Sequence, residues 1–369
     1  GCEPSECVVI EDSINGIKAG YAAGMKVIHI PDTIEINDDI RRLTSVVCHS
    51  LSDVPDIVDT WNEGKVADVE GYYENAKINR VYVDRVHVKK AFAEYTVAYN
   101  ADDPKIKLKI DHTYRVAALC ERIAKAAGMC AYDVELAWLS GMLHDVGRFE
   151  QIKRYNTFSD ADSVDHAKFG ADLLFKDGLI STFLNGMVKC TGYKPGALED
   201  RYSSDGVFLY DRLNKSDMEM LELAIRCHNM YRIPQGLNCR EQAFCNVLRD
   251  ADKVDIFKVN IDTPLEEIYN TTTEELMKSD ITDEVLEAFG EEHCILKAIR
   301  RTPADTVIGH VSLAYELVYD ESVRITVEQG YLAKLMHFHS DNEETNRKMA
   351  MVREKMDSYV KKRIGKKDA

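Results

Sequence analysis

The segment WLSGMLHDVGRFEQ, at residues 138–151, places a histidine and an aspartate side by side near the end of an apolar run. Chain neighbours on a helix point about 100° apart, so helical pairing does not explain the doublet of His144 and Asp145. Two interpretations are open: the doublet holds a metal ion, or it is an ordinary polar helix end. The choice depends on whether other ligands lie at helix positions that converge on it.

The composition restricts the class of protein and its partners. The chain has 369 residues, which predicts two or three domains with hydrophobic cores. Its formal net charge is −16, so its surface repels nucleic-acid backbones and acidic membranes, and we expect neither as a partner. Ten cysteines without a CxxC pair, and the lack of a signal peptide or a long apolar run, predict a cytoplasmic protein with reduced thiols. The oligomeric state stays open.

The pattern of apolar residues changes near residue 68. Before it, short apolar runs such as ECVVIED and MKVIHIPD alternate with helical stretches, which predicts a parallel α/β layer. Beyond it, a 3.6-residue period predicts an almost wholly helical structure. The predicted fold class is therefore mainly α, with a short N-terminal α/β fragment. The expected parts are the fragment at 1–62, a linker and entry helices at 63–95, a helical core at 96–265, and its helical extension at 266–369.

Six potential metal ligands fall on or beside the core-facing sides of five helical stretches. They are His112, His144, Asp145, His166, His228 and Asp252. A buried carboxylate without a partner is costly, and convergence with imidazoles on a divalent cation removes that cost. A single histidine on an apolar face is more often an ordinary hydrogen-bonded core residue, but six such residues favour a metal site. Histidine and aspartate without thiolate suit one or two ions of Mn, Fe, Zn, Ni or Co.

The order of these residues resembles the HD superfamily of metal-dependent phosphohydrolases. LHDVGR, at 143–148, is similar to that family's second motif, and RDADKVDIF, at 249–257, is similar to its last. His166 and His228 match two extra histidines of the members that hold two metals. The resemblance covers about residues 75–265, and we expect the later helices to complete the same domain.

The resemblance implies a phosphohydrolase that cleaves a phosphate ester of a small metabolite, a nucleotide or a sugar phosphate, by metal-activated water. Asp145 would bridge two cations, one also held by His112, His144 and Asp252 and the other by His166 and His228. Arg148 would contact the phosphate; the alternative is a surface arginine at a helix C-terminus, where Gly147 is expected to end the helix. The polar stretch at 154–166 is expected to line the mouth of the site, without individual roles for its aspartates.

Two other functions remain open. Some HD proteins with a similar ligand order carry a di-iron pair and use oxygen to cleave C–C or C–P bonds. A regulatory protein that only senses a metal or a nucleotide, without turnover, is the third possibility. Metal content and oxygen consumption would separate the two enzymes.

The N-terminal residues carry a second resemblance. ECVVIEDSINGIKAGYAAGMKVIHIPD, at 6–32, resembles the last conserved segment of the haloacid dehalogenase (HAD) superfamily, in the subgroup of β-phosphoglucomutase. In that family the acidic pair after the strand, here Glu11 and Asp12, helps to hold Mg²⁺. The aspartate nucleophile motif of that family does not precede this segment. We therefore expect a fragment of a longer HAD–HD fusion, or a structural remnant, and assign it no HAD activity.

Overall fold

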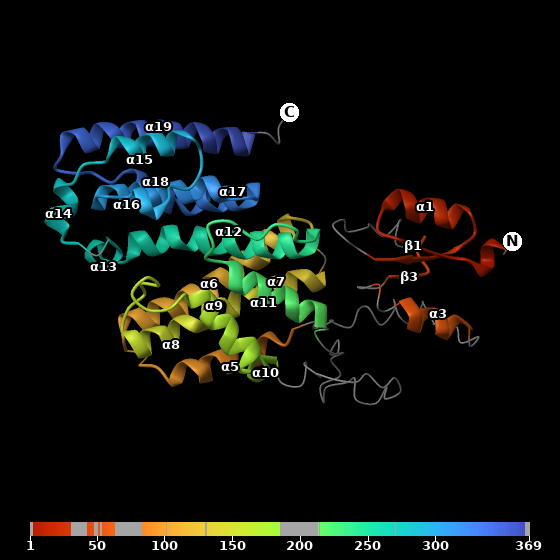
Figure 1. The fold of residues 1–369 in the computed structure, drawn as a ribbon. Coiled ribbons are helices and arrows are strands. Elements are labelled where there is room, and N and C mark those ends of the chain that lie inside the picture. The colour runs from red at the N-terminus through yellow and green to blue at the C-terminus, as the bar shows by residue number, and fades with distance from the viewer. Residues whose placement is uncertain are drawn as a thin grey trace.

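The structure is a computed structural model, drawn in Figure 1, that describes residues 3–30, 43–47, 51, 54–62, 83–100, 102–129, 131–184, 213, 215–269 and 271–365. Much of the predicted linker, at 63–82, lies outside the described residues. All further statements concern the described part of the chain.

The N-terminal residues form a small parallel sheet, as the sequence predicts. Its elements are the 3₁₀ turn η1 (Pro4–Glu6), β1 (Val8–Glu11), α1 (Ile14–Ala22), β2 (Lys26–His29), β3 (Val46–Val47) and α3 (Val54–Asn62), with strand order β1-β2-β3. The Ser13 side chain caps α1 by accepting a hydrogen bond from the backbone N–H of Gly16 at 3.1 Å. Ile17 of α1 packs on Val27 of β2, and both are fully buried.

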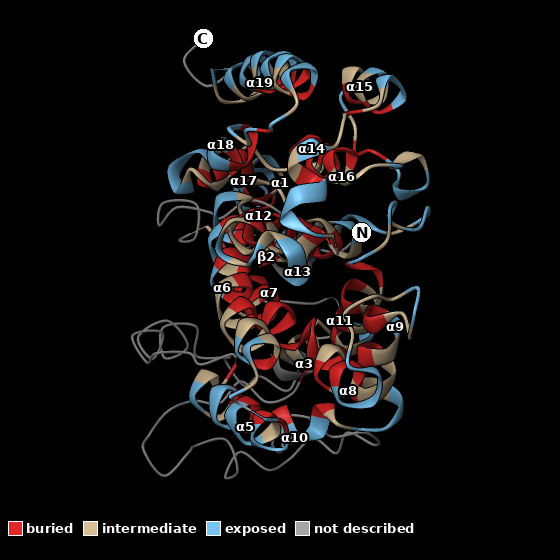
Figure 2. Cartoon of the chain, turned by 90° about the vertical axis from the view of Figure 1, so that its left-hand side faces the viewer, coloured by how far each residue is buried: buried red, intermediate tan, exposed pale blue. Residues whose placement is uncertain are grey.

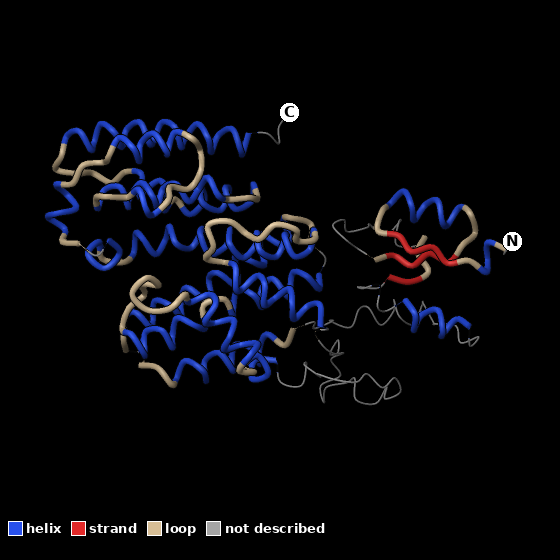
Figure 3. Tube along the Cα trace, viewed as in Figure 1, coloured by secondary structure: helices blue, strands red, loops and turns tan. Residues whose placement is uncertain are grey.

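From residue 83 onward, every regular element among the described residues is helical, and Figure 3 shows the strands confined to the N-terminal part. The first group is α5 (Arg85–Val97), α6 (Pro104–Ala126), α7 (Ala131–Leu143), α8 (Val146–Tyr155), α9 (His166–Ala171), the π-turn Asp172–Lys176, α10 (Ile180–Leu184), α11 (Lys215–Cys227) and α12 (Cys239–Asp262). The second group is α13 (Leu265–Tyr269), α14 (Thr273–Lys278), α15 (Asp283–Gly290), Lys297–Ile299, α16 (Pro303–Val311), Ser312–Glu316, α17 (Asp320–Gln329), α18 (Tyr331–Met336) and α19 (Glu343–Ile364). The mainly α prediction is confirmed.

The long helix α12 lies between two layers of helices, with α5 to α11 on one side and α14 to α19 on the other (Figures 1 and 2). It contributes Leu248 and Val254 to one hydrophobic core and Phe257 to a second core formed with the later helices. Each of these side chains is almost completely buried, and burying a side chain of this size stabilises the fold by about 1.5–3 kcal/mol. The later helices therefore have an apolar core of their own and meet the first layer along α12.

A glycine brings α6 and α7 close together. A Cβ atom added to Gly141 would lie 2.6 Å from Cα of Ala117, a separation that packed atoms do not reach. The absence of a side chain at this position lets the two helix backbones approach each other. Because His112 lies on α6 and His144 directly follows α7, this contact helps to set the distance between the two rings.

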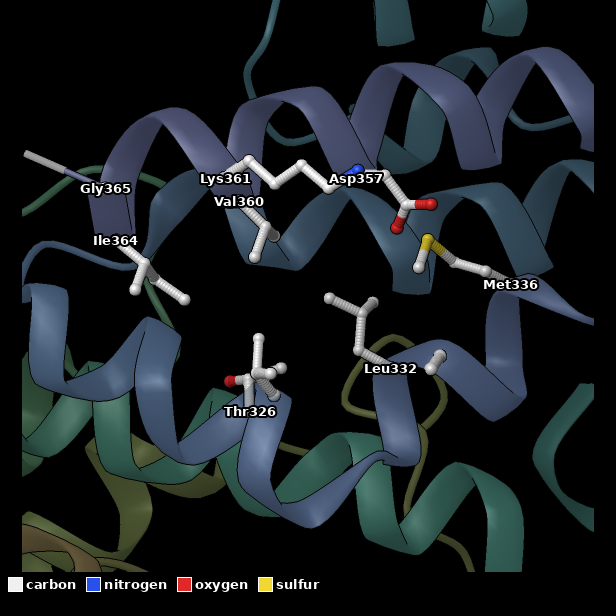
Figure 4. A pocket seen from close by; sticks show the side chains of 10 residues that line it. Thr326, Leu332, Met336, Asp357, Val360, Lys361, Ile364 and Gly365 are labelled. Atoms are coloured by element: carbon white, nitrogen blue, oxygen red, sulfur yellow. The ribbon is translucent and has the colours of Figure 1, made fainter.

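The second layer contains an open groove between α17, α18 and α19 (Figure 4). Apolar side chains including Leu332, Met336, Val360 and Ile364 line it, and none of the six predicted metal ligands does. The groove is therefore separate from the predicted site. Among the described helices, none combines the length and apolar character that crossing a membrane requires.

Candidate metal centre

The structure brings all six predicted ligands together from within or at the ends of six helices. His112 lies within α6, His144 follows α7, Asp145 precedes α8, His166 begins α9, His228 follows α11 and Asp252 lies within α12. The four histidines and Asp145 are buried, and the Asp252 side chain is 16% exposed. Two overlapping sets, His112–His144–Asp252 and His144–Asp145–His228, each place their ligand atoms within 4.8 Å of one another.

The first set surrounds one oxygen of Asp145. Nε2 of His112 lies 3.3 Å from Nε2 of His144 and 3.2 Å from Oδ1 of Asp252. Both Nε2 atoms lie 3.6 Å from Oδ2 of Asp145. Four ligand atoms from four residues thus face one small volume.

Two further imidazoles, those of His166 and His228, face the other oxygen of the same carboxylate. Nε2 of His166 and Nε2 of His228 lie 3.1 Å apart, and they lie 3.6 Å and 3.8 Å from Oδ1 of Asp145. The rings of His144 and His228 meet edge to face with centroids 5.1 Å apart, which joins the histidines around Oδ2 to those around Oδ1. Asp145 therefore presents Oδ2 to one group of ligands and Oδ1 to the other.

Hydrogen bonds to backbone carbonyls fix two of the four rings. Nδ1 of His144 lies 2.7 Å from the carbonyl oxygen of Gly141, and Nδ1 of His228 lies 2.7 Å from that of Ile225. A carbonyl oxygen only accepts, so Nδ1 carries the proton in both rings and Nε2 presents a lone pair to the centre. This is the arrangement that metal-binding histidines need.

A buried carboxylate orients His112. Oδ2 of Asp255 lies 2.6 Å from Nδ1 of His112, on the side of the ring away from the centre. The guanidinium of Arg115 holds this carboxylate, with Nε 2.6 Å from Oδ1 and Nη2 2.9 Å from Oδ2. Asp255 lies in the motif at 249–257, but the sequence analysis gave it no role. The signal was available, because a carboxylate three residues from a ligand lies on the same side of the helix.

Asp160 holds His166 in the same way. Its Oδ2 lies 2.6 Å from Nδ1 of His166, and its Oδ1 accepts hydrogen bonds from Arg148 at 2.9 Å and Gln151 at 3.0 Å. Asn229, next to His228, adds a weaker contact at 3.4 Å. The sequence could not single out Asp160 among the aspartates of its loop, because no helical period relates it to the other ligands.

The protonation states of the predicted ligands favour binding of a cation. Burial lowers the pKa of His166 and that of His228 to about 4, so both rings are neutral near neutral pH. Burial alone would raise the pKa of Asp145, but Lys109 and the neighbouring imidazoles outweigh it and hold that pKa well below its usual range. Lone pairs of neutral imidazoles and carboxylate oxygens that converge at 3.1–3.9 Å repel one another unless a cation lies between them.

Lys109 is a further charged residue that sequence reasoning missed. Its Nζ lies 2.7 Å from Oδ2 of Asp145 and 5.4 Å from the centroid of the Phe158 ring. Lys109 precedes His112 by three residues on α6, so the two side chains share a helix face. That spacing could have identified the lysine as a neighbour of the centre.

Two predictions about the segment after the doublet are wrong. Gly147 does not end a helix, because α8 begins at Val146 directly after Asp145. A Cβ at Gly147 would lie 2.5 Å from the carbonyl oxygen of His166, so the glycine instead allows α9 to approach α8. Arg148 lies in the first turn of α8 and its side chain is only 14% exposed, which overturns the alternative of a surface arginine at a helix C-terminus.

Comparison with known families gives a match to this part of the chain. Residues 110–255 match the HD domain family, and the match contains all six ligands. Residues 110–255 form an HD domain. HD domains bind divalent metal ions, and the histidine and aspartate clusters of this HD domain could hold them.

One curated relative matches a short part of the chain. The uncharacterized protein C4C5.01 of Schizosaccharomyces pombe is 41% identical over 51 residues, which are 13% of this chain and 20% of that protein. The chain thus spans about a fifth of the length of this relative. No solved structure matches the chain.

Proposed function

We propose that the HD domain is a metal-dependent phosphohydrolase that cleaves a phosphate ester of a small metabolite, a nucleotide or a sugar phosphate. One observation carries the proposal: Asp145 directs Oδ2 at His112 and His144, and Oδ1 at His166 and His228. This geometry suits a carboxylate that bridges two cations. Divalent ions bound there supply Lewis-acid polarisation of a phosphoryl oxygen and lower the pKa of a water.

Two cationic side chains flank Asp145 and suit a phosphoryl group. Nε of Arg148 is buried without a hydrogen-bond partner and lies 3.8 Å from Oδ1 of Asp145. The Arg148 guanidinium and the Lys109 ammonium lie 5.7 Å and 5.4 Å from the centroid of the Phe158 ring. In the proposed reaction Arg148 and Lys109 bind the phosphoryl oxygens and stabilise the charge that develops on them.

Asp160 contacts both Arg148, the proposed phosphate-binding residue, and His166, a predicted metal ligand. One of its oxygens accepts from Arg148 and the other faces Nδ1 of His166. A substrate that moves Arg148 would therefore act on the carboxylate that orients His166. In the proposed enzyme Asp160 positions both groups and does not itself touch the substrate.

The test combines metal analysis with a screen of phosphorylated compounds. The purified full-length chain is analysed for bound metals and incubated with nucleotides and sugar phosphates while released phosphate is measured. We expect Mn, Fe, Zn, Ni or Co, at up to two ions per chain, and phosphate release that Asp145→Ala abolishes together with metal binding. Oxygen consumption without phosphate release would support the di-iron oxygenase instead, and bound metal with neither activity would support a sensor.

For the N-terminal part, we propose a fragment of a HAD-type domain without activity of its own. The parallel strands β1 and β2 with α1 between them support this, as does the position of Glu11 at the C-terminal end of β1. Val8 and Ile10 of the edge strand β1 are 36% and 43% exposed, which fits a sheet that in a whole domain continues further. If the HD domain alone carries the activity, the double variant Glu11→Ala, Asp12→Ala retains phosphate release at the wild-type rate.

We further propose a cytoplasmic location. The cysteines of the described residues are free thiols, and Cys120, Cys227 and Cys245 are buried in the HD domain. Reduced, buried thiols are typical of proteins in reducing compartments. Fractionation of cells that produce the full-length chain would test this.

A further inference from the structure

Two buried basic side chains on α12 have no acidic partner. Arg249 and Lys253 lie one helical turn apart, and each residue is only 8% exposed. Within the described residues, no carboxylate forms an ion pair with either. Their polar contacts are weak ones to backbone carbonyls, from Arg249 Nη2 to Tyr231 at 3.3 Å and from Lys253 Nζ to Arg249 at 3.4 Å.

The acids of this neighbourhood are engaged elsewhere. Glu316 accepts hydrogen bonds from Nη1 of Arg232 at 2.6 Å and from the backbone N–H of Cys294 at 3.2 Å. Asp250, beside Arg249 in the chain, accepts from the Ser322 hydroxyl at 2.7 Å. It also accepts from the backbone N–H groups of Val318 and Tyr319, which directly precede α17. Asp252, beside Lys253, belongs to the metal centre. These acids influence the two cations only through space, and none forms an ion pair with Arg249 or Lys253.

Two other partly buried arginines among the described residues pair with carboxylates. Arg115 binds Asp255, and Arg240 lies 2.7 Å from both Asp133 and Asp217. Burying a cation without such a partner costs several kcal/mol. Burial lowers the pKa of Arg249. Arg249 and Lys253 lack such a carboxylate while lying side by side on one helix turn, and a bound anion would supply the missing negative charge.

We propose that Arg249 and Lys253 form a binding site for a phosphate-like oxyanion. The guanidinium offers a planar fork of N–H donors that suits two oxygens, and the ammonium adds a compact charge beside it. Tyr231, whose carbonyl contacts Arg249, follows His228 by three residues, so the loop after this ligand borders the site. The proposed site shares no residue with the metal centre and does not depend on hydrolysis.

Binding of radiolabelled sulfate to the metal-loaded full-length chain tests the site. Sulfate matches phosphate in shape and is not a substrate for ester hydrolysis. We expect Lys253→Met and Arg249→Met each to weaken sulfate binding at least about tenfold, roughly the loss of 1.4 kcal/mol of a charge-assisted contact. Lys258→Met is the matched control, because Lys258 lies on the same helix, is partly exposed and pairs with Asp262. It should bind sulfate as the wild type does.

Competition identifies the source of the anion. If inorganic phosphate displaces sulfate and glycerol phosphate does not, the site takes the free ion; if both displace it, the site takes a phosphoryl group of an organic molecule. The proposal is overturned if the wild type binds no sulfate at roughly 10 mM, well above a millimolar dissociation constant. It is also overturned if both Met variants bind like the wild type. Lys253→Arg keeps the charge and should retain binding, which separates loss of the site from loss of the fold.

Discussion

Oδ2 of Asp160 lies 2.6 Å from Nδ1 of His166, and Nε2 of the same ring lies 3.6 Å from Oδ1 of Asp145. The Asp160 carboxylate therefore orients the His166 ring from outside the centre, while the Asp145 carboxylate and the ring both present ligand atoms to the centre. Asp255 does the same for His112. Each half of the centre thus contains one histidine fixed by a carboxylate and one fixed by a backbone carbonyl.

Replacing Asp160 by Asn should weaken the metal site that contains His166. The amide keeps the size of the side chain but removes the negative charge that stabilises the N–H of the ring. We expect metal affinity at this site to fall by about 10- to 100-fold, with the other site less affected. Mass spectrometry of the purified protein and metal titrations would measure this. Asp162→Asn, at an exposed position in the same loop, is the control and should retain full metal content.

Replacing Lys109 by Met should impair hydrolysis more than metal binding. The proposed reaction loses one charged donor to the phosphoryl oxygens, worth about 1.5–3 kcal/mol, so kcat/KM should fall by roughly 10- to 100-fold. Lys107→Met is the control, since Lys107 is 69% exposed and pairs with Asp111 on the helix surface. If Lys109→Met instead loses its metal with an unchanged rate per bound ion, Lys109 serves to hold Asp145 and not the substrate.

The metal-free chain should become less stable as the pH falls from about 6.5 towards 4. His166 and His228 have pKa values near 4 in the folded chain because they are buried, against about 6.5 when unfolded. In this range the unfolded chain takes up protons that the folded chain does not. Each histidine therefore lowers the free energy of unfolding by about 1.4 kcal/mol per pH unit. Hydrogen bonds to Asp252 and Asp255 outweigh burial and raise the pKa of His112, so this ring adds stability as the pH falls towards 6.5 and little slope below it.

Urea unfolding of the metal-free chain at several pH values would measure the effect. The double variant His166→Asn, His228→Asn lacks both groups, so its free energy of unfolding should depend less steeply on pH. Equal slopes in the variant and the wild type would show that these two rings do not govern the dependence.

The sequence predicted the ligands that lie on helices better than the groups that support them. His112 and Asp252 could be found because a 3.6-residue apolar stripe defines which side of a helix is buried. Asp160 lies in an irregular loop after α8, whose last residue, Tyr155, is followed by Asn156 in a left-handed conformation with φ of 54°. The direction of the chain after such a turn depends on tertiary contacts. No local pattern therefore showed that Asp160 would reach His166.

The error at Gly147 has a related cause. A glycine after an apolar stripe favours a helix C-terminus, and α7 does end just before the doublet, at Leu143. The sequence does not show that a second helix starts after only two intervening residues, because Asp145 precedes α8 without forming the usual side-chain cap. The Asp145 side chain, which at this position would ordinarily cap the helix, is directed at the metal centre instead. The sequence therefore lacks the usual indication that a helix starts at Val146.

Replacing Gly147 by Ala tests whether the contact between α8 and α9 sets the geometry of the centre. The added Cβ would lie 2.5 Å from the carbonyl oxygen of His166 and 2.7 Å from the backbone nitrogen of Gly170, so one backbone must move. Such overpacking costs about 1–3 kcal/mol, and we expect the urea midpoint to fall accordingly. Because His166 begins α9, the same movement should lower metal affinity on its side of Asp145. Gly290→Ala is the matched control: a Cβ at this last residue of α15 meets only the flexible end of Lys355 at 3.6 Å, so stability should hold or rise slightly. A Gly147→Ala variant with wild-type stability and full metal content would show that α9 can shift without moving the His166 ring.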